Sequence, residues 1–374
     1  MTTSKSLRVV VLGTRGFPDV QGGIETHCEN LYPRLAERGC EVFVVTRKPY
    51  VDASNRIYRG VNLIPLGCPK NKSLEAFSHT LRGVMAARKL SPTVLHIHGI
   101  GPSLLVPLAR LLKLKVVMTN HGPDYNRDKW GILAKSVLRL GERLGSRWAN
   151  GVICISDPIA ADIQKRHGTI ATVIPNGVNL PPLCETQESL DEYGLTKNQY
   201  VLSVGRFVPE KGFHDLIEAF HALQPVGWKL VIVGRADHED NYSSRLKAMA
   251  QSNANVILPG FLKGKPLQEL YAHAALFVLP SYHEGLPIVL LEAMSYGLDC
   301  IASGIPANRN IPFGEDRFFE PGNIAQMSAL MARRIEAPLS EEEKGAMRRL
   351  VAETYNWESI AEKTISVYHT VAAE

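Results

Sequence analysis

The sequence predicts an α/β protein with two doubly wound domains, each a parallel sheet between layers of helices. One indication is the length of 374 residues, since single domains commonly hold about 150 residues. The other is an alternation of short, mostly apolar runs with longer helix-like segments, which is typical of buried parallel strands. The expected strands are Val9–Leu12, Val42–Thr46, Val94–Ile97, Val116–Thr119 and Val152–Ile155 in the first half, and Tyr200–Val204, Leu230–Val233, Val256–Leu258 and Leu276–Leu279 in the second.

The domain boundary is expected where Pro181-Pro182 is followed by an acidic, polar stretch. This gives a first Rossmann-like domain at 1–178, a linker at 179–196 and a second Rossmann-like domain at 197–355. Residues 356–374 are expected to form a final helix. Ligands of such sheets bind beyond the carboxyl ends of the strands, so we expect function in the loops after those runs, beside a cleft between the domains.

Composition places the chain among folded soluble proteins, with 45% hydrophobic and 21% charged residues. The charge is uneven along the chain. Residues 1–178 hold 25 Lys and Arg against 12 Asp and Glu, whereas 179–374 hold 17 against 25, although the whole chain carries only +5. The basic first half indicates an anionic partner, such as lipid headgroups, a diphosphate or a nucleic acid. A chance imbalance on two solvated surfaces is the alternative.

The cysteines and the apolar stretches predict a cytoplasmic protein. Six scattered cysteines form no Cys-x-x-Cys pair and no zinc spacing, which favours reduced thiols. Met1–Leu7 is polar and lacks the pattern of a signal peptide. The most apolar stretch, Leu104–Met118, is broken by a proline and three basic residues, so no bilayer span is predicted. Any membrane contact is therefore expected at the surface.

A glycine-rich loop follows the first expected strand, with Gly13 and Gly16 and then Gly22-Gly23 before a helix-like stretch. Glycines at a strand-to-helix turn allow close backbone approach, and helix amides bind anions, so the loop could cradle a diphosphate. The spacing is not G-x-G-x-x-G and no acid ends the second strand, which disfavours a dinucleotide site. A plain glycine-rich turn remains possible.

Two cations open the second half. Arg206 follows the strand Tyr200–Val204, and Lys211 lies five residues further on. Fixed cations at a strand end suit a diphosphate whose charge grows as a bond breaks. Cations at a helix start are otherwise unfavourable.

The segment after the last expected strand carries the sharpest signal. Glu284 lies in the loop, and a helix that begins near Leu286 contains Glu292. The helix amides can meet a phosphate, while Glu292 can accept paired hydrogen bonds from a ribose diol. In its apolar surroundings, Glu292 is expected to need a partner.

These motifs resemble a known family. The Glu284-x7-Glu292 pair, Gly-Arg…Glu-Lys-Gly at 205–212, Asn-Gly-Val at 176–178 and the Gly-Gly-x-Glu loop are similar to retaining family 4 glycosyltransferases with the GT-B fold. Gly-Thr-Arg-Gly-Phe-Pro at 13–18 and the segment after His121 look more narrowly like a bacterial rhamnosyltransferase-like branch. The resemblance spans nearly the whole chain, and it implies that the helix at 356–374 crosses back to the first domain.

The resemblance implies roles for residues at matching positions. Catalytic groups would be His121, Glu284, Arg206 and Lys211, with His121 beside the donor sugar and the acceptor hydroxyl. Glu292 would hold the donor ribose, and the two cations would hold its diphosphate. The remaining donor contacts would come from Gly22, Gly23, Gly260, Leu262, Leu286, Ile288 and Val289. Pro287 departs from many relatives and removes one backbone N–H that might meet the ligand.

The implied reaction moves a hexose or deoxyhexose from a nucleoside-diphosphate sugar to a saccharide, with retention, in bacterial surface polysaccharide synthesis. A donor phosphate oxygen would take the acceptor proton, whereas double displacement through Glu284 is less favoured. No Asp-x-Asp motif occurs, so neither a metal nor another cofactor is expected. Alternatives are a GT-B sugar-nucleotide epimerase, a dehydrogenase, or a non-catalytic module that binds anions or lipids.

A helix-like stretch from Trp130 to Trp148 carries a basic stripe. Lys135, Arg139, Arg143 and Arg147 recur every four residues beside Leu133, Val137, Leu140 and Leu144. It could dock on anionic lipid at the inner membrane face, which favours a lipid-linked acceptor, or it could be a solvated face packed by its leucines. Nucleic-acid binding is disfavoured because aromatic residues only bracket the stripe.

Overall fold

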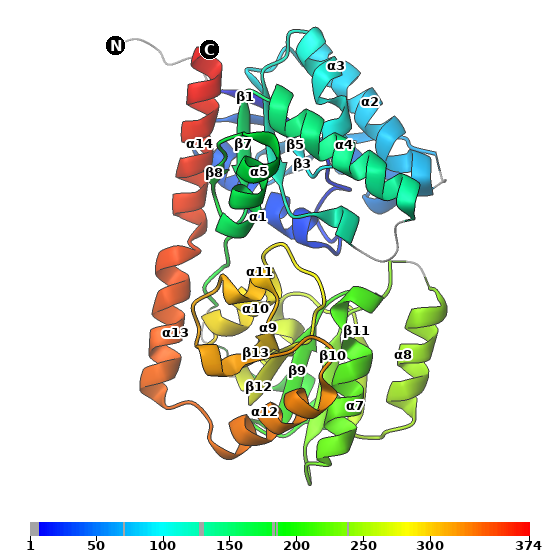
Figure 1. Ribbon diagram of the computed structural model, residues 1–374, viewed down its shortest axis with the longest axis vertical. Helices are drawn as coiled ribbons and strands as arrows, with labels where there is room; N and C mark the ends of the chain where they lie inside the picture. The colour runs from blue at the N-terminus through cyan, green and yellow to red at the C-terminus, as the bar shows by residue number, and fades with distance from the viewer. Residues whose placement is uncertain (1–6, 70–71, 127–130, 182–183, 185, 238) are drawn as a thin grey trace. The chain divides into compact units, whose positions relative to one another are not determined.

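The computed structural model describes residues 7–69, 72–126, 131–181, 184, 186–237 and 239–374, and contains two compact units (Figure 1). The first joins Met1–Gly177 with Trp357–Glu374, and the second is Val178–Asn356. Each is a parallel sheet between helices, so the prediction of two Rossmann-like α/β domains is confirmed. No helix in the described ranges has the length and apolar character needed to cross a bilayer.

The sheet of the first unit has the strand order β3-β4-β2-β1-β5-β6-β7-β8. Neighbouring strands are parallel except β3 and β4. The order reverses between β1 and β5, where Val9 pairs with Val94, so loops after these strands diverge and leave room for ligands. The strands are β1 Arg8–Leu12, β2 Glu41–Arg47, β3 Ile57–Tyr58, β4 Val61–Leu66, β5 Val94–His98, β6 Val116–Asn120, β7 Gly151–Cys154 and β8 Thr172–Val173.

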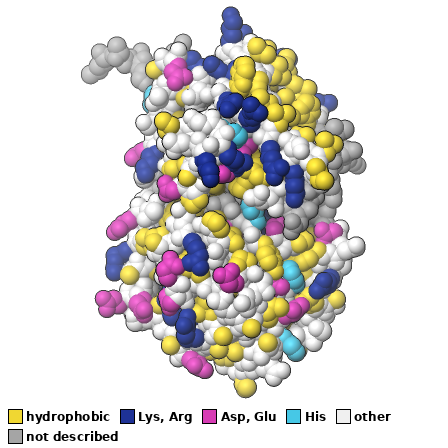
Figure 2. Space-filling view, viewed as in Figure 1, with side chains coloured by type: hydrophobic (Ala, Val, Ile, Leu, Met, Phe, Trp, Pro, Cys, Tyr) yellow, Lys and Arg dark blue, Asp and Glu magenta, His cyan; other side chains and the backbone are white. Residues whose placement is uncertain are grey.

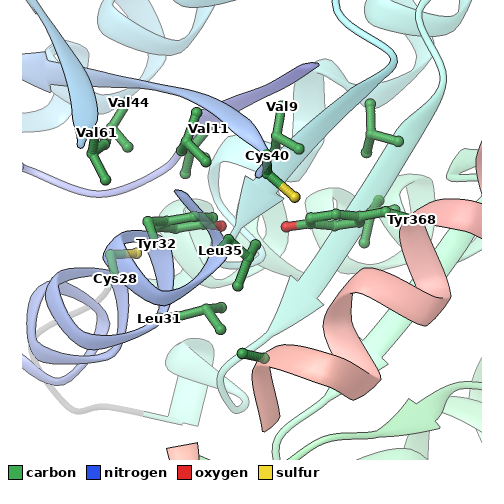
Figure 3. Close-up of a cluster of buried hydrophobic side chains, with 14 of the residues drawn as sticks. Val9, Val11, Cys28, Leu31, Tyr32, Leu35, Cys40, Val44, Val61 and Tyr368 are labelled. Atoms are coloured by element: carbon green, nitrogen blue, oxygen red, sulfur yellow. The ribbon is translucent and has the colours of Figure 1, made fainter. Parts of the chain in front are cut away.

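The two faces of this sheet support separate apolar cores because successive strand residues point to opposite faces. Val9 and Val11 pack with α1 and α14, whereas Val10 and Leu12 pack in the core that includes α2 and α3. Figure 3 shows side chains of α1, including Tyr32, close to Tyr368 of α14. The helices are α1 Gly23–Glu37, α2 Lys72–Leu90, α3 Val106–Leu111, α4 Ile132–Trp148, α5 Asp157–His167 and α14 Trp357–Ala373, with short 3-10 turns η1 Lys48–Tyr50, η2 Pro102–Leu105 and η3 Asp124–Asn126.

The second unit repeats the plan with the order β11-β10-β9-β12-β13-β14, and its order reverses between β9 and β12. The strands are β9 Tyr200–Val204, β10 Lys229–Val233, β11 Val256–Gly260, β12 Leu276–Leu279, β13 Asp299–Ser303 and β14 Phe318–Phe319. The helices are α6 Glu188–Glu192, α7 Phe213–Leu223, α8 Asn241–Gln251, α9 Lys265–His273, α10 Ile288–Ser295, α11 Pro306–Arg309, α12 Ile324–Glu336 and α13 Glu341–Thr354, with 3-10 turns η4 Pro209–Lys211 and η5 Glu315–Arg317.

The segment 179–196, expected as a linker, belongs to the second unit in the structure and contains α6. The buried carboxylate of Glu269 on α9 accepts hydrogen bonds from the Ser189 amide (2.7 Å) and the Thr186 hydroxyl (2.5 Å). These bonds satisfy polar groups at the start of α6 and fasten the segment to α9.

Helix α4 packs by a different face from the one expected. The possibility that its apolar stripe packs against the domain fails for three of its four residues, since Leu133, Val137 and Leu140 are exposed and Leu144 is partly buried. The buried side of α4 holds the small residues Gly141, Gly145 and Ser146 together with Glu142. A Cβ built on Gly141 would lie 2.2 Å from the carbonyl oxygen of Ile100, so only glycine allows this close approach.

This packing predicts opposite effects for two neighbouring substitutions in α4. Gly141→Ala should lower the free energy of unfolding by about 1–3 kcal/mol, because the new methyl group meets a backbone carbonyl. Leu140→Ser should change it by less than about 0.5 kcal/mol, as expected at the surface. Urea titrations of both variants give the two values. A stabilised Gly141→Ala variant, the usual result for glycine inside a helix, would contradict the packing.

Candidate functional site

The glycine-rich loop after β1 packs tightly against the end of β5. Gly13 has φ +100°, and a Cβ there would lie 2.0 Å from the carbonyl oxygen of His98. The loop is closed by Arg15, whose amide donates to Glu25 Oε1 (3.0 Å) and whose guanidinium bonds Glu25 and the carbonyl of Gln21. This ion pair holds the Gly22-Gly23 turn, where α1 begins, in one conformation.

No side chain in the described ranges caps the start of α1. The first amides of a helix have no partner within the helix, and they carry a positive partial charge. Gly22 and Gly23 therefore lie where backbone N–H groups could bind a phosphate, as their positions in the sequence predict.

His121 belongs to a buried chain of hydrogen bonds in the first unit. Its Nε2 is 2.8 Å from Nδ1 of His98 at the end of β5. The hydroxyl of Tyr32 bonds His98 Nε2 and lies 3.0 Å from Nδ1 of His96. The same His96 nitrogen lies 2.6 Å from the hydroxyl of Tyr368, so the chain runs from the loop after β6 to α14.

Burial keeps these imidazoles neutral. Desolvation, with a smaller contribution from His96, lowers the pKa of His121 to about 3, and burial lowers the pKa of His96 similarly. At neutral pH His121 is thus a weak base that can still donate or accept a hydrogen bond. Because its partner His98 is itself held by Tyr32, the ring of His121 has a fixed orientation.

Sequence reasoning missed the residues that support His121. His96 and His98 form a His-x-His pattern at the end of β5, and this polar ending of an apolar strand was the available signal. His27 of α1 is also buried, with its ring centroid 5.2 Å from that of His121. Nothing local in the sequence of α1 marks His27 as a neighbour of His121.

Hydrogen bonds of Asn120 hold the loop that follows His121 in place. Asn120 accepts from the amide of Gly122 (2.8 Å) and donates to the buried Glu142 of α4 (3.3 Å). Glu142 also pairs with Arg166 of α5 (3.0 Å). A buried carboxylate needs such partners, and here they connect the loop to two helices.

In the second unit, the predicted cations lie at the carboxyl ends of β9, β10 and β12, and each is paired with a carboxylate. Arg206 is 2.9 Å from Asp237, which follows β10. Lys211 Nζ is 2.6 Å from Glu284 Oε1, which also accepts from the Ser281 hydroxyl (2.6 Å). The sequence predicted the two cations but not their pairing, and nothing in it marked Asp237 or Ser281 as a neighbour.

The meeting of Lys211 and Glu284 depends on the backbone of Gly212. This residue has φ +65°, and a Cβ there would lie 2.3 Å from the carbonyl oxygen of Pro280. The turn after β9 can therefore touch the end of β12 only with glycine at this position. That contact brings Lys211 beside the loop that carries Glu284.

Glu292 lies on the largely apolar helix α10, and its carboxylate has one identified hydrogen-bond partner among the described residues. The hydroxyl of Tyr271 on α9 donates to Glu292 Oε2 (3.1 Å). Burial raises the pKa of Glu292 to about 7, although the tyrosine bond opposes this change. The side chain is partly exposed, so its carboxylate can meet a ligand. Tyr271, which stacks on Tyr296 with ring centroids 5.4 Å apart, was missed from the sequence.

Two further predicted segments lie at the same edge of the second sheet. Gly260 ends β11 and accepts from the amide of Gly234, which follows β10 (2.8 Å). Leu262 lies two residues further on and is partly exposed. Leu286, Ile288 and Val289 surround the start of α10, and no side chain in the described ranges caps this helix.

Across the described ranges, no group of three or more His, Cys, Asp and Glu residues is placed to hold a metal ion. The chemistry-bearing groups therefore form two sets, one at the carboxyl edge of each sheet. The first holds Gly22, Gly23 and His121, and the second holds Arg206, Lys211, Glu284 and Glu292.

Comparison with known proteins assigns both halves of the chain. The model of Glycosyltransferase Family 4 matches residues 21–181, and that of Glycosyl transferases group 1 matches residues 185–349. Alpha-maltose-1-phosphate synthase of Mycolicibacterium smegmatis is 27% identical, covering 98% of this chain and 100% of that protein. A Bacillus subtilis glycosyltransferase named for teichuronic acid biosynthesis is 28% identical over 59% of this chain, which spans 55% of that relative's length.

Solved structures agree on the fold. Sucrose-phosphate synthase of Thermosynechococcus elongatus superimposes with a TM-score of 0.86 at 21% identity, covering 98% of this chain and 99% of that chain. HepE of Anabaena, solved with UDP-glucose, gives 0.78 at 17% identity and covers 98% and 100%. The chain is a glycosyltransferase of the GT-B fold, with a family 4 first domain and a group 1 second domain.

Proposed function

We propose that this glycosyltransferase moves a hexose or a deoxyhexose such as rhamnose from a nucleoside-diphosphate sugar to a saccharide acceptor. The transfer retains the anomeric configuration, needs no metal ion, and serves the synthesis of a bacterial surface polysaccharide. The observation that carries the proposal is the set of groups at the carboxyl edge of the second sheet, where paired cations, an uncapped helix and the raised pKa of Glu292 occur together. Such a combination suits an anionic nucleotide.

The paired state of the cations favours diphosphate binding. A lysine ammonium has three N–H donors and a guanidinium has five, so Lys211 can keep Glu284, and Arg206 can keep Asp237, while each also meets a phosphate oxygen. The two carboxylates then fix the orientation of the cations before the ligand binds. Preoriented charge of this kind stabilises a leaving diphosphate with little reorganisation.

The nucleoside end of the donor is assigned to α10 and β11. Glu292 would accept hydrogen bonds from the two ribose hydroxyls, with Tyr271 holding its carboxylate in place. Backbone groups of Gly260 and Leu262 would line the base. The amides around Leu286, Ile288 and Val289 would share the phosphate charge with the cations.

The first unit is assigned the remaining contacts. The amides of Gly22 and Gly23 would bind donor phosphate, and His121 would contact the transferring sugar and the acceptor hydroxyl. The low pKa of His121 makes it a poor general base, which supports a route in which another group takes the acceptor proton.

In that route the bond from the anomeric carbon to the diphosphate oxygen breaks first, and the diphosphate leaves with the electron pair. The acceptor oxygen attacks the same face of the sugar, and its proton passes to a donor phosphate oxygen. Glu284 is a less suitable nucleophile for double displacement, since its Oε1 already accepts from Lys211 and Ser281.

The acceptor is proposed to be a saccharide carried on a membrane lipid diphosphate, with the enzyme at the cytoplasmic face. The Bacillus subtilis relative is named for teichuronic acid biosynthesis, which supports an acidic polysaccharide as the class of product. The basic balance of residues 1–178 supports an anionic partner for the first unit.

The pKa of Glu292 predicts how donor affinity changes with pH. If the ionised carboxylate binds the ribose, affinity should rise roughly tenfold from pH 6 to pH 8, because a pKa near 7 leaves about a tenth of the groups ionised at pH 6. Calorimetry with UDP-glucose, or with the GDP or dTDP sugar if that binds, measures this change. These donors gain or lose no phosphate proton in that range.

Glu292→Gln is the matched control, because it keeps the shape and cannot ionise. It should bind more weakly at pH 8, with an affinity that is flat between pH 6 and pH 8. A wild-type affinity that is equally flat, or a Gln variant with unchanged affinity, would remove Glu292 from the donor site.

The hydrogen bond between His98 and His121 predicts a second effect, on turnover. His98→Leu should lower the rate of sugar release from the donor about 10- to 100-fold, because His121 loses its orienting partner, while the donor KM changes little. His98→Asn places a polar atom near the original Nδ1 and should restore part of the rate. Full turnover in His98→Leu, with nucleotide binding intact, would assign the histidine chain to the core alone.

A further inference from the structure

Exposed large apolar side chains are concentrated on one part of the first unit. Among the described residues, nine of the fourteen lie on α2, α3 and α4. They are Phe77, Leu81, Met85, Leu111, Ile132, Leu133, Val137, Leu140 and Trp148. The turn η2 contacts all three helices, so these side chains belong to neighbouring elements. Figure 2 shows apolar side chains, with basic ones beside them, where Figure 1 places α2, α3 and α4.

On α2 the exposed apolar residues form a stripe. Phe77, Leu81 and Met85 follow one another at intervals of four and are 44%, 37% and 48% exposed. On an adjoining side of the helix, Val84 and Ala87 pack in a buried core with residues of β1 and β5. Helix α2 therefore has one apolar face in the core and a second that is open to solvent.

On α4 the open face is more strongly apolar. Ile132 and Leu133 are 88% and 80% exposed, and Val137 and Leu140 continue the same side of the helix. The small residues Gly141 and Gly145 occupy the packed side. The unusual use of glycines for packing leaves the large apolar side chains facing outward.

The charges around these faces have one sign. Arg82, Arg88 and Lys89 are exposed on α2, and Arg139, Arg143 and Arg147 are exposed on α4. The acidic residues in the described parts of α2, α3 and α4 are Glu75 and Glu142, whose side chains are 12% and 2% exposed and pair with Arg47 and Arg166. The solvent-facing charge of these helices is therefore basic.

We propose that α2, α3 and α4 form a membrane-docking face that binds anionic lipid. The apolar side chains of α2 and α4 enter the boundary between headgroups and acyl chains, and the arginines and lysines beside them bind the lipid phosphates. Apolar residues flanked by basic ones are what a helix lying in the bilayer interface requires. The arrangement goes beyond a basic stripe on one helix, since two helices supply both kinds of side chain.

Charge complementarity favours an anionic bilayer as the occupant. A second copy of this chain would bring the same basic charges together on the docking face and would be repelled. Lipid phosphates instead surround the inserted apolar groups on every side. This inference stands on residues that the proposed donor site does not use, so it holds or fails independently of the proposed transfer reaction.

Flotation of the full-length protein with vesicles tests the docking face. The wild type should float with mixed phosphatidylglycerol and phosphatidylcholine vesicles and much less with phosphatidylcholine alone. Arg139→Gln with Arg143→Gln should lower binding roughly thirtyfold. Leu133→Ser with Leu140→Ser, and separately Phe77→Ser with Met85→Ser, should each lower it at least about tenfold, because inserted apolar groups are lost.

Ile170→Ser and Val226→Ser are the matched controls, since Ile170 and Val226 are 85% and 94% exposed but lie outside these helices. Both should bind vesicles like the wild type, and all variants should keep the wild-type unfolding midpoint. Failure of the wild type to float, or equal loss in the controls, would overturn the proposal. Light scattering that shows a dimer broken by Leu133→Ser with Leu140→Ser would instead assign the face to self-association.

Discussion

The candidate donor site depends on the contact between Gly212 and the carbonyl of Pro280. The parallel strands β9 and β12 are neighbours in the sheet, and the loops that follow them run in different directions. Side chains of the two loops meet only where their backbones approach closely. Glycine at 212 permits this approach, and the ion pair of Lys211 with Glu284 follows from it. The same principle operates in the first unit, where Gly13 touches the carbonyl of His98. Both sites therefore rest on backbone contacts that any larger residue would prevent.

Buried polar groups are the second constraint, because each must find a partner or remain neutral. The carboxylates of Glu269 and Glu142 are satisfied by hydrogen bonds and ion pairs that connect loops to helices. The buried histidines are satisfied in another way: His98 bonds His121, and His96 bonds the hydroxyls of two tyrosines. These hydrogen bonds also fix the orientation of the rings. Among the described residues, the carboxylate of Glu292 has one identified hydrogen bond, from Tyr271, and its pKa is raised, so a ligand that donates hydrogen bonds would add the partners it lacks. We therefore assign Glu269 and Glu142 a structural role and Glu292 a role in ligand binding.

The sequence predicted the fold class because buried parallel strands such as Val94–His98 appear as short apolar runs. Strands with other sequence patterns were not predicted. β4, Val61–Leu66, contains Pro65 and alternates buried with partly exposed residues, while β13 begins with Asp299, whose charge is paired with Arg317 and Arg334. The carboxylate partners of the cations were also not predicted, because Asp237 is 31 residues from Arg206 and only the sheet brings them together. Local patterns report elements and motifs, whereas partners distant in sequence depend on tertiary packing.

The central claim is that the second unit binds a nucleoside diphosphate through Arg206, Lys211 and Glu292. The most direct measurement is the thermal unfolding midpoint of the wild type with UDP, GDP, dTDP and NAD, each with and without EDTA. A nucleoside diphosphate at a hundredfold over its dissociation constant adds about 2.7 kcal/mol of apparent stability. One nucleoside diphosphate should raise the midpoint equally with and without EDTA. A rise with NAD alone, or with none of the four, would contradict the claim.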